Sequence, residues 1–152
     1  MDMQAMLDQA AARCAARGAQ LTPLRREVLR LVLEAEQPLG AYALLDQLRG
    51  SRGAAAPPTI YRALDFLLEQ GLIHKLERLN AFTPCVEAGH AHAGCGPDHP
   101  HQFLICRQCG ATTELTDAGV AHALEAAAAR AGFRVERMTV ELEGLCAACA
   151  GG

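Results

Sequence analysis

Metal-binding side chains crowd into one segment of this 152-residue chain, His99-Pro-His101-Gln-Phe-Leu-Ile-Cys106-Arg-Gln-Cys109-Gly-Ala-Thr-Thr-Glu114. Two histidines precede a short apolar run, two cysteines stand three positions apart, and a glutamate closes the segment. Imidazole, thiolate and carboxylate together are the ligands of a borderline-soft divalent metal such as zinc. The segment therefore predicts a metal centre built on short strands.

Composition excludes several classes of protein. No apolar run approaches the ~18 residues of a membrane span, and the N-terminus lacks the charged-then-apolar pattern of a secretory signal. The seven cysteines are an odd number, which argues against a disulfide framework and for metal or thiol chemistry in a reducing compartment. We therefore expect a cytoplasmic protein with no membrane partner.

The net charge of −3 is unevenly distributed. Residues 1–84 carry ten Lys and Arg against nine Asp and Glu, a balance of +1, whereas residues 85–152 carry four against eight, a balance of −4. The basic side chains that could meet phosphate are therefore mostly in the first half of the chain.

Helical patterns fill most of the first 70 residues. Apolar spacing and capping residues predict helices over residues 3–17, 24–35, 41–49 and 60–70. Two short alternating runs, 72–77 and 81–83, then predict a hairpin with a turn near Asn80. Helices followed by a hairpin are the order of a winged helix-turn-helix, in which the helix before the hairpin enters the major groove of DNA.

The second half has a different pattern. It predicts strands over residues 102–105, 111–115 and 133–143, with a helix over 117–130. Residues 85–101 are rich in Gly, Pro, Ala and His and show no period. We therefore expect an α+β protein, with a winged-helix DNA-binding domain at 1–84, a hinge or loop at 85–100, and an α/β zinc-binding domain at 101–152.

Four cysteines form two Cys-x-x-Cys pairs, Cys106 with Cys109 and Cys146 with Cys149. Two such knuckles can enclose one tetrahedral zinc ion with no open position, which predicts a structural site. The alternative is four buried or redox-active thiols. A thioredoxin-like motif would need one such pair beside a βαβ unit, and this chain has two pairs flanking a strand–helix–strand pattern.

A second metal site is the sharper prediction. Its candidate ligands come from the expected hairpin, the hinge and the strands around the first knuckle: His74, Cys85, His99, His101 and Glu114. The alternative is that His74 is a solvated strand residue and Glu114 an edge-strand charge. Five of the six histidines lie within residues 74–101, which favours the metal site, and His90, His92 and Cys95 could be auxiliary ligands.

Candidate DNA contacts lie on or near the expected reading helix. Arg62 can bond the O6 and N7 atoms of guanine, and Tyr61 and Thr59 are its neighbours. Tyr61 could instead pack in the core. Arg25 and Tyr42 are candidates for contacts to phosphates or bases, against the alternative of a solvated surface.

With these residues in place, the chain resembles the Fur family of metal-dependent repressors, and within it the branch that responds to zinc. The matching segments are residues 21–29, 41–46, 57–75, 103–110 and 144–149, in an order and spacing that both hold. The resemblance implies a homodimer joined through the C-terminal module and two winged helices on a pseudo-palindromic operator.

The resemblance also implies two zinc ions per chain. A structural zinc is expected at the four knuckle cysteines, and a regulatory zinc at His74, Cys85, His99 and Glu114. The interval between Cys85 and His99 is longer than the family pattern, so His101 is an alternate ligand, and His92 or Cys95 could also displace His99. The thiolate of Cys85 favours zinc over iron or manganese, which suit sites of nitrogen and oxygen alone.

The function expected on these grounds is a zinc-activated repressor of zinc uptake genes, a step that rests on the family. Two other classes compete with it. A zinc hydrolase or deaminase would need an open catalytic metal, and the deaminase signature His-x-Glu with Pro-Cys-x-x-Cys is missing, so we expect no enzyme. A DNA-binding protein with structural zinc alone, or an iron- or manganese-responsive repressor, would be separated from it by the role of Cys85.

Overall fold

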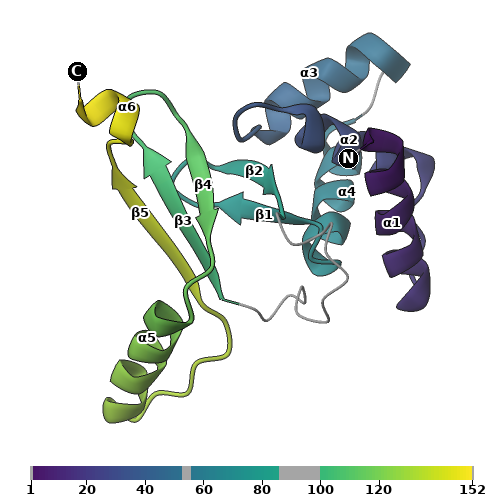
Figure 1. Cartoon of the computed structure of the whole chain (residues 1–152). Coiled ribbons are helices and arrows are strands. Elements are labelled where there is room, and N and C mark those ends of the chain that lie inside the picture. Colours follow the sequence, from purple (N-terminus) through teal and green to yellow (C-terminus); the bar gives the residue numbers. More distant parts are fainter. Residues whose placement is uncertain (1, 53–55, 86–99, 152) are drawn as a thin grey trace. The chain divides into compact units, whose positions relative to one another are not determined.

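The computed structural model describes residues 2–52, 56–85 and 100–151, and it divides into two compact units, Met1–Pro97 and Asp98–Gly152 (Figure 1). The expected hinge at 85–100 falls almost entirely outside the described residues. Among those residues, no helix has the length and apolar character needed to cross a membrane.

Unit 1 contains four helices and a hairpin. The elements are α1 (Met3–Ala16), α2 (Pro23–Glu34), α3 (Ala41–Arg52), α4 (Pro57–Glu69), β1 (Ile73–Leu76) and β2 (Ala81–Pro84). Local chemistry explains their ends. Thr22 caps α2 by accepting a hydrogen bond from the backbone N–H of Arg25, and Pro23 occupies the first turn. Gly71 ends α4 with a φ of 67°, a left-handed conformation that glycine adopts without strain.

The helices of unit 1 bury one apolar face each in a shared core. Ile60, Leu64 and Leu67 of α4 are fully buried there, as their spacing of three and four residues requires. Cys14 of α1 also lies in this core. In contrast, Thr59, Arg62 and Asp65 are on the exposed side of α4. The predicted amphipathic helix is therefore confirmed.

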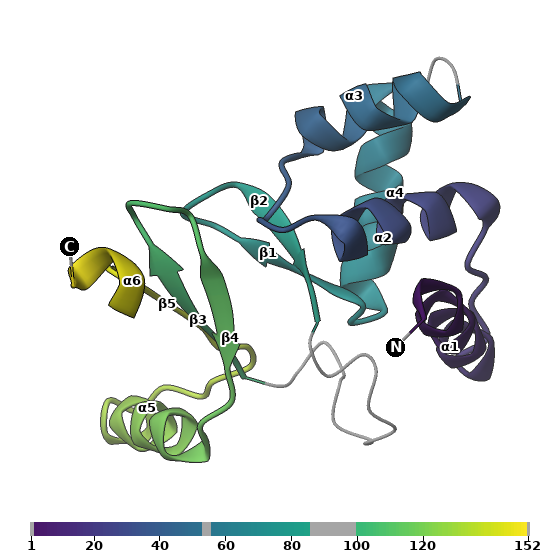
Figure 2. The same cartoon turned by 45° about the horizontal axis from the view of Figure 1, so that its top comes forward.

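The hairpin of unit 1 is antiparallel, with Ile73 opposite Pro84 and Leu76 opposite Ala81. The turn between its strands ends at Asn80, whose φ of 46° is one that asparagine tolerates better than most residues. Leu39 adds a bridge to Phe82 and so ties the α2–α3 connection to the hairpin (Figure 2). Helices followed by this small sheet make the winged helix-turn-helix.

Unit 2 is a three-stranded sheet with helices near its ends (Figures 1 and 2). Its elements are β3 (His101–Cys106), β4 (Thr112–Leu115), α5 (Ala118–Arg130), β5 (Thr139–Gly144) and α6 (Ala147–Ala150). β3 is central, with β4 antiparallel on one side and β5 parallel on the other. The parallel pairing requires a crossover, which α5 and its flanking segments supply.

The predicted strand over residues 133–143 is wrong in its first half. β5 begins at Thr139, and Phe133 is 68% exposed. The physical reason is the partner: His101, the first residue of β3, pairs with Thr139, so residues before Thr139 have no strand to bond. The short helix α6 within the second knuckle was also not predicted. The α+β fold class itself is confirmed.

Candidate metal centres and nucleic-acid interface

The two cysteine knuckles meet at one end of the sheet of unit 2. Cys106 is the last residue of β3, and Cys146 precedes α6, two residues after β5. β3 and β5 run parallel with Cys106 opposite Gly144, so both knuckles begin at the same edge. The backbone N–H of Arg107 donates to the carbonyl oxygen of Gly144 at 2.9 Å, which fixes the two turns against each other.

The sulfur atoms of this cluster have the spacing of a zinc site. All four Sγ atoms, of Cys106, Cys109, Cys146 and Cys149, lie within 4.8 Å of one another. Cys109 Sγ and Cys146 Sγ are 3.8 Å apart. Tetrahedral coordination with zinc–sulfur bonds of about 2.3 Å requires sulfur–sulfur distances of about 3.8 Å. The donor set and its geometry therefore fit zinc.

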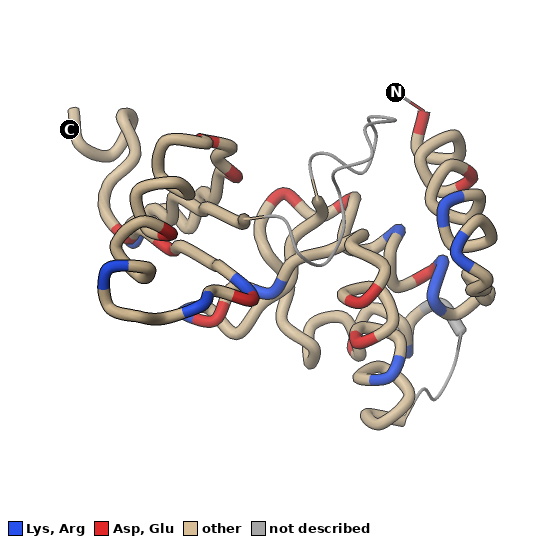
Figure 3. Tube along the Cα trace, turned by 90° about the horizontal axis from the view of Figure 1, so that it is seen from below, with Lys and Arg blue, Asp and Glu red and all other residues tan. Residues whose placement is uncertain are grey.

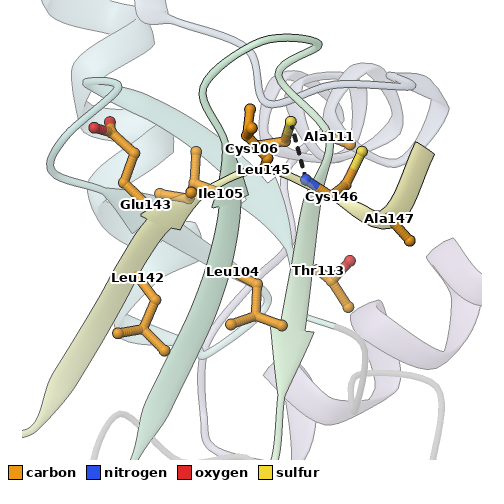
Figure 4. A pocket seen from close by; sticks show the side chains of 11 residues that line it. Leu104, Ile105, Cys106, Ala111, Thr113, Leu142, Glu143, Leu145, Cys146 and Ala147 are labelled. Carbon is orange, nitrogen blue, oxygen red and sulfur yellow. Dashed lines mark hydrogen bonds between the residues drawn. The ribbon is translucent and has the colours of Figure 1, made fainter. Parts of the chain in front are cut away.

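The ionisation of the cluster also indicates a cation. Backbone N–H groups of Cys109 and Cys146 lower the pKa of the Cys106 thiol to about 6, and the Cys146 N–H lies 3.3 Å from Cys106 Sγ (Figure 4). Contact with the sulfur atoms of Cys146 and Cys109 raises the pKa of Cys149 to about 12. Without a metal, the fourth thiol therefore resists ionisation beside its neighbours, and a divalent cation is what allows four thiolates to coexist.

A second group of candidate ligands lies on one face of the sheet of unit 2. His101 Nδ1 is 3.8 Å from a carboxylate oxygen of Glu114. The pairing explains this proximity, because Glu114 lies opposite Phe103, and Phe103 points to the same face as His101 two residues earlier. The His101 ring also stacks on Phe103, with 6.3 Å between ring centres. The structure thus brings together the carboxylate of the predicted regulatory set and its alternate histidine.

Two other predicted ligands belong to the hairpin of unit 1. His74 lies opposite Thr83, and the backbone N–H of Cys85 donates to the carbonyl oxygen of Leu72 at 3.1 Å. Residues two apart share a face of a strand, so His74 and Cys85 are diagonal neighbours on one face of the hairpin. Both are buried. His99, His90, His92 and Cys95 lie outside the described residues.

Most of the candidate DNA contacts are exposed on adjoining helices of unit 1. Tyr42, at the start of α3, is 75% exposed and Tyr61 of α4 is 48% exposed, so Tyr61 does not pack in the core. Both tyrosines line the same shallow hollow beside the hairpin. Thr59 and Arg62 are exposed on α4 beside Tyr61. Lys and Arg alternate with Asp and Glu along both units, so no strongly basic surface is added to these residues (Figure 3).

Arg25 has a different environment from the other candidates. Its guanidinium lies 3.7 Å from the centre of the Phe66 ring. Phe66 did not figure among the functional candidates, although its position four residues after Arg62 places it beside that side chain on the helix.

The sequence profile of the ferric uptake regulator family matches residues 16–143. This chain belongs to that family. The zinc uptake regulation protein of Escherichia coli K12 is 44% identical over 146 residues, which cover 96% of this chain and 82% of that protein.

Two solved structures of the ferric uptake regulator family resemble the whole chain. A zinc uptake regulator complexed with zinc and DNA has a TM-score of 0.89 at 42% identity, covering 99% of this chain and 97% of that one. Holo XcZur has a TM-score of 0.84 at 43% identity, covering 97% of this chain and 99% of that one. The expected family is therefore confirmed.

Proposed function

We infer that this protein is a zinc-responsive transcriptional repressor of the ferric uptake regulator family. It binds operator DNA as a homodimer when its regulatory zinc site is filled, and it controls genes of zinc uptake. The observation that carries this inference is the similarity, over almost the whole chain, to a zinc uptake regulator bound to zinc and DNA. Such a protein acts in the cytoplasm on double-stranded DNA, as a regulator and not as an enzyme.

We propose two zinc ions per chain with different roles. The structural ion belongs to Cys106, Cys109, Cys146 and Cys149, whose sulfur spacing fits it. The regulatory ion belongs to His74, Cys85, His99 and Glu114, with His101 as the alternate to His99. The proximity of His101 to Glu114 and the shared hairpin face of His74 and Cys85 support this set.

Zinc selectivity follows from the ligand chemistry of the regulatory set. Cys85 supplies a thiolate, which iron- and manganese-responsive sites of nitrogen and oxygen ligands lack. A bound zinc ion would supply the one link that holds ligands from both units together. Because His74 and Cys85 belong to the DNA-binding unit, their capture would select one orientation of that unit.

The coupling between zinc and DNA is reciprocal by thermodynamic linkage. If ligand capture orders the DNA-binding units in advance by ~3 kcal/mol, operator affinity rises more than about 100-fold. DNA binding raises the zinc affinity by the same factor. Contacts to DNA are proposed for Thr59, Tyr61 and Arg62 of α4 and for Tyr42 of α3, all of them exposed.

The homodimer is proposed to form through unit 2. Thr113, Leu104 and Leu142 form a row across one face of the sheet, and Leu142 is 54% exposed. Together with Leu145 they line a hollow on this face (Figure 4). Leu124 and Phe133 of the α5 region are exposed as well. An apolar surface of this kind marks a protein–protein interface.

The decisive test uses protein loaded with one zinc per chain and titrated with free Zn²⁺ while binding to a selected operator duplex is followed. Wild-type affinity is expected to rise at least about 100-fold, and Cys85→Ala to remain weak. Cys14→Ala is the matched control, because Cys14 is a buried cysteine of the same unit with no proposed ligand role. Operator affinity that ignores zinc would leave a DNA-binding protein with structural zinc alone. A stronger response to iron or manganese would reassign the metal.

A further inference from the structure

Arg25 makes two contacts that join the start of α2 to the reading helix α4. Its guanidinium lies 3.7 Å from the centre of the Phe66 ring, the geometry of a cation–π interaction. Its Nη1 donates a hydrogen bond of 2.8 Å to the carbonyl oxygen of Gln20. Phe66 in turn packs against the core of unit 1. Arg25 is thus fixed on both sides, by the segment before α2 and by α4.

The position of Arg25 in its own helix does not account for these contacts. Arg25 is the third residue of α2, in the first turn, where the helix dipole disfavours a positive charge. Its backbone N–H accepts the cap from Thr22, but its side chain gains nothing from the helix itself. The favourable interactions of the guanidinium are those with Phe66 and Gln20.

The contact with Phe66 lies next to the proposed base-reading residue. Phe66 follows Arg62 by four residues, so the two side chains are neighbours on one side of α4. Ile60, Leu64 and Leu67 hold the opposite side of the helix in the core. A planar guanidinium stacked on Phe66 therefore limits rotation of α4 about its axis, and with it the direction in which Arg62 points.

A second arginine acts at the same half of α4. Arg17 Nη1 donates to the carbonyl oxygen of Gln70, the residue that ends the helix, at 3.2 Å. A cation at this end is favoured by the helix dipole. The half of α4 that follows Arg62 is thus held by side chains from the α1–α2 region.

We propose that Arg25 is a positioning residue for DNA reading, which orients Arg62 through Phe66 and makes no phosphate contact of its own. The inference rests on the proposed function. It replaces the expectation that Arg25 touches DNA directly, and it predicts an effect on the specificity of DNA binding in place of an effect on its electrostatics.

The test compares zinc-loaded Arg25→Gln with Arg26→Gln. Arg26 is the matched control because it loses the same charge at the next residue, while its partner is Asp8 of α1, 2.6 Å away. The probes are a duplex that the wild type selects from a random pool and an unrelated duplex of equal length. We expect Arg25→Gln to bind the selected duplex about tenfold more weakly, within the range of one lost base contact. Its affinity for the unrelated duplex and its salt dependence should not change. Arg26→Gln should leave all three unchanged.

Two further variants separate the contact from the charge. Phe66→Leu should reproduce the loss, and adding it to Arg25→Gln should weaken binding no further, because both remove the same interaction. Arg25→Lys keeps the charge but loses the planar stack, so it should bind the selected duplex nearly as weakly as Arg25→Gln. Thermal unfolding of each variant shows that binding is measured on folded protein.

Three results would overturn the inference. Parallel losses on both duplexes, with a salt slope smaller by about one, would place Arg25 on a phosphate. Full binding by Arg25→Lys would have the same meaning. A lower unfolding temperature with unchanged binding would make Arg25 a structural residue alone. If the wild type selects no duplex, the proposed function fails first, which the wild-type protein shows without any variant.

Discussion

Cys109 Sγ lies 3.8 Å from Cys146 Sγ, although 37 residues separate them in the chain. The two knuckles converge because β3 and β5 are parallel and in register up to Cys106 and Gly144. In this small unit, where α5 buries Ala121 alone among its described residues, few apolar contacts hold the knuckles in place. A metal staple is the expected compensation for so small a core.

Loss of one knuckle cysteine should therefore unfold unit 2. We expect Cys146→Ser to lower the zinc content by one ion per chain and to reduce the free energy of unfolding by several kcal/mol, since structural zinc binding is folding free energy of about 10 kcal/mol or more in small domains. Zinc content by mass spectrometry and thermal unfolding by circular dichroism would check this. Cys85→Ser is the control, expected to lose an ion but keep its fold. Equal stability of Cys146→Ser and wild type would contradict the structural role.

The regulatory set predicts a separable loss of the second zinc. Glu114→Gln removes the charged ligand near His101 while keeping its size, so zinc affinity at this site should fall at least about tenfold, as it does even for residues that only support a ligand. Competition with a chromophoric chelator measures this. The structural zinc and the unfolding temperature should change little.

His99→Ala and His101→Ala then decide between the two candidate histidines. The variant with the larger loss of zinc affinity identifies the ligand. If neither variant binds zinc more weakly, the regulatory set is wrong in this part.

The apolar face of unit 2 predicts the site of dimerisation. Leu142→Glu places a charge in the centre of the row formed with Leu104, and an unpaired charge buried in an interface costs about 3–5 kcal/mol. The dimer dissociation constant should rise more than about 100-fold in analytical ultracentrifugation. Leu79→Glu is the matched control, an exposed leucine in unit 1. A dimer that tolerates Leu142→Glu would place the interface elsewhere.

Cys14 predicts a difference in reactivity among the cysteines. Burial raises the pKa of its thiol, although Arg13, Arg17 and Arg25 act in the opposite direction. Because the thiolate is the reactive form, Cys14 should resist alkylation by iodoacetamide at pH 8 in the folded protein and react after unfolding in urea. Peptide mass spectrometry after zinc chelation would locate the label. Exposed Cys109 should react first, and rapid labelling of Cys14 in folded protein would contradict its burial.

The unfolded chain has no such burial, so its Cys14 thiol ionises at a lower pH than the folded one. The contribution of this thiol to stability is therefore present at neutral pH and declines as the pH rises through the pKa of the unfolded state.

Local chemistry accounts for the parts of the fold that the sequence predicted well. Thr22-Pro23 opens α2 and Gly71 ends α4 because capping and a positive φ depend on neighbouring residues alone. The apolar spacing of Ile60, Leu64 and Leu67 depends only on the helical period. The ligand types of the metal sites are equally local, since thiolate and imidazole chemistry belongs to the residue.

The tertiary structure decided what depends on partners distant in the chain. β5 begins at Thr139 and not at Phe133, because a strand extends only as far as another strand can bond it. The alternation before Thr139 could not reveal this. The sequence alone determined the presence of two knuckles and a charged Arg25. Only packing decided that four sulfur atoms meet at a spacing that fits zinc, and that Arg25 lies on Phe66, because these contacts depend on the relative placement of whole elements.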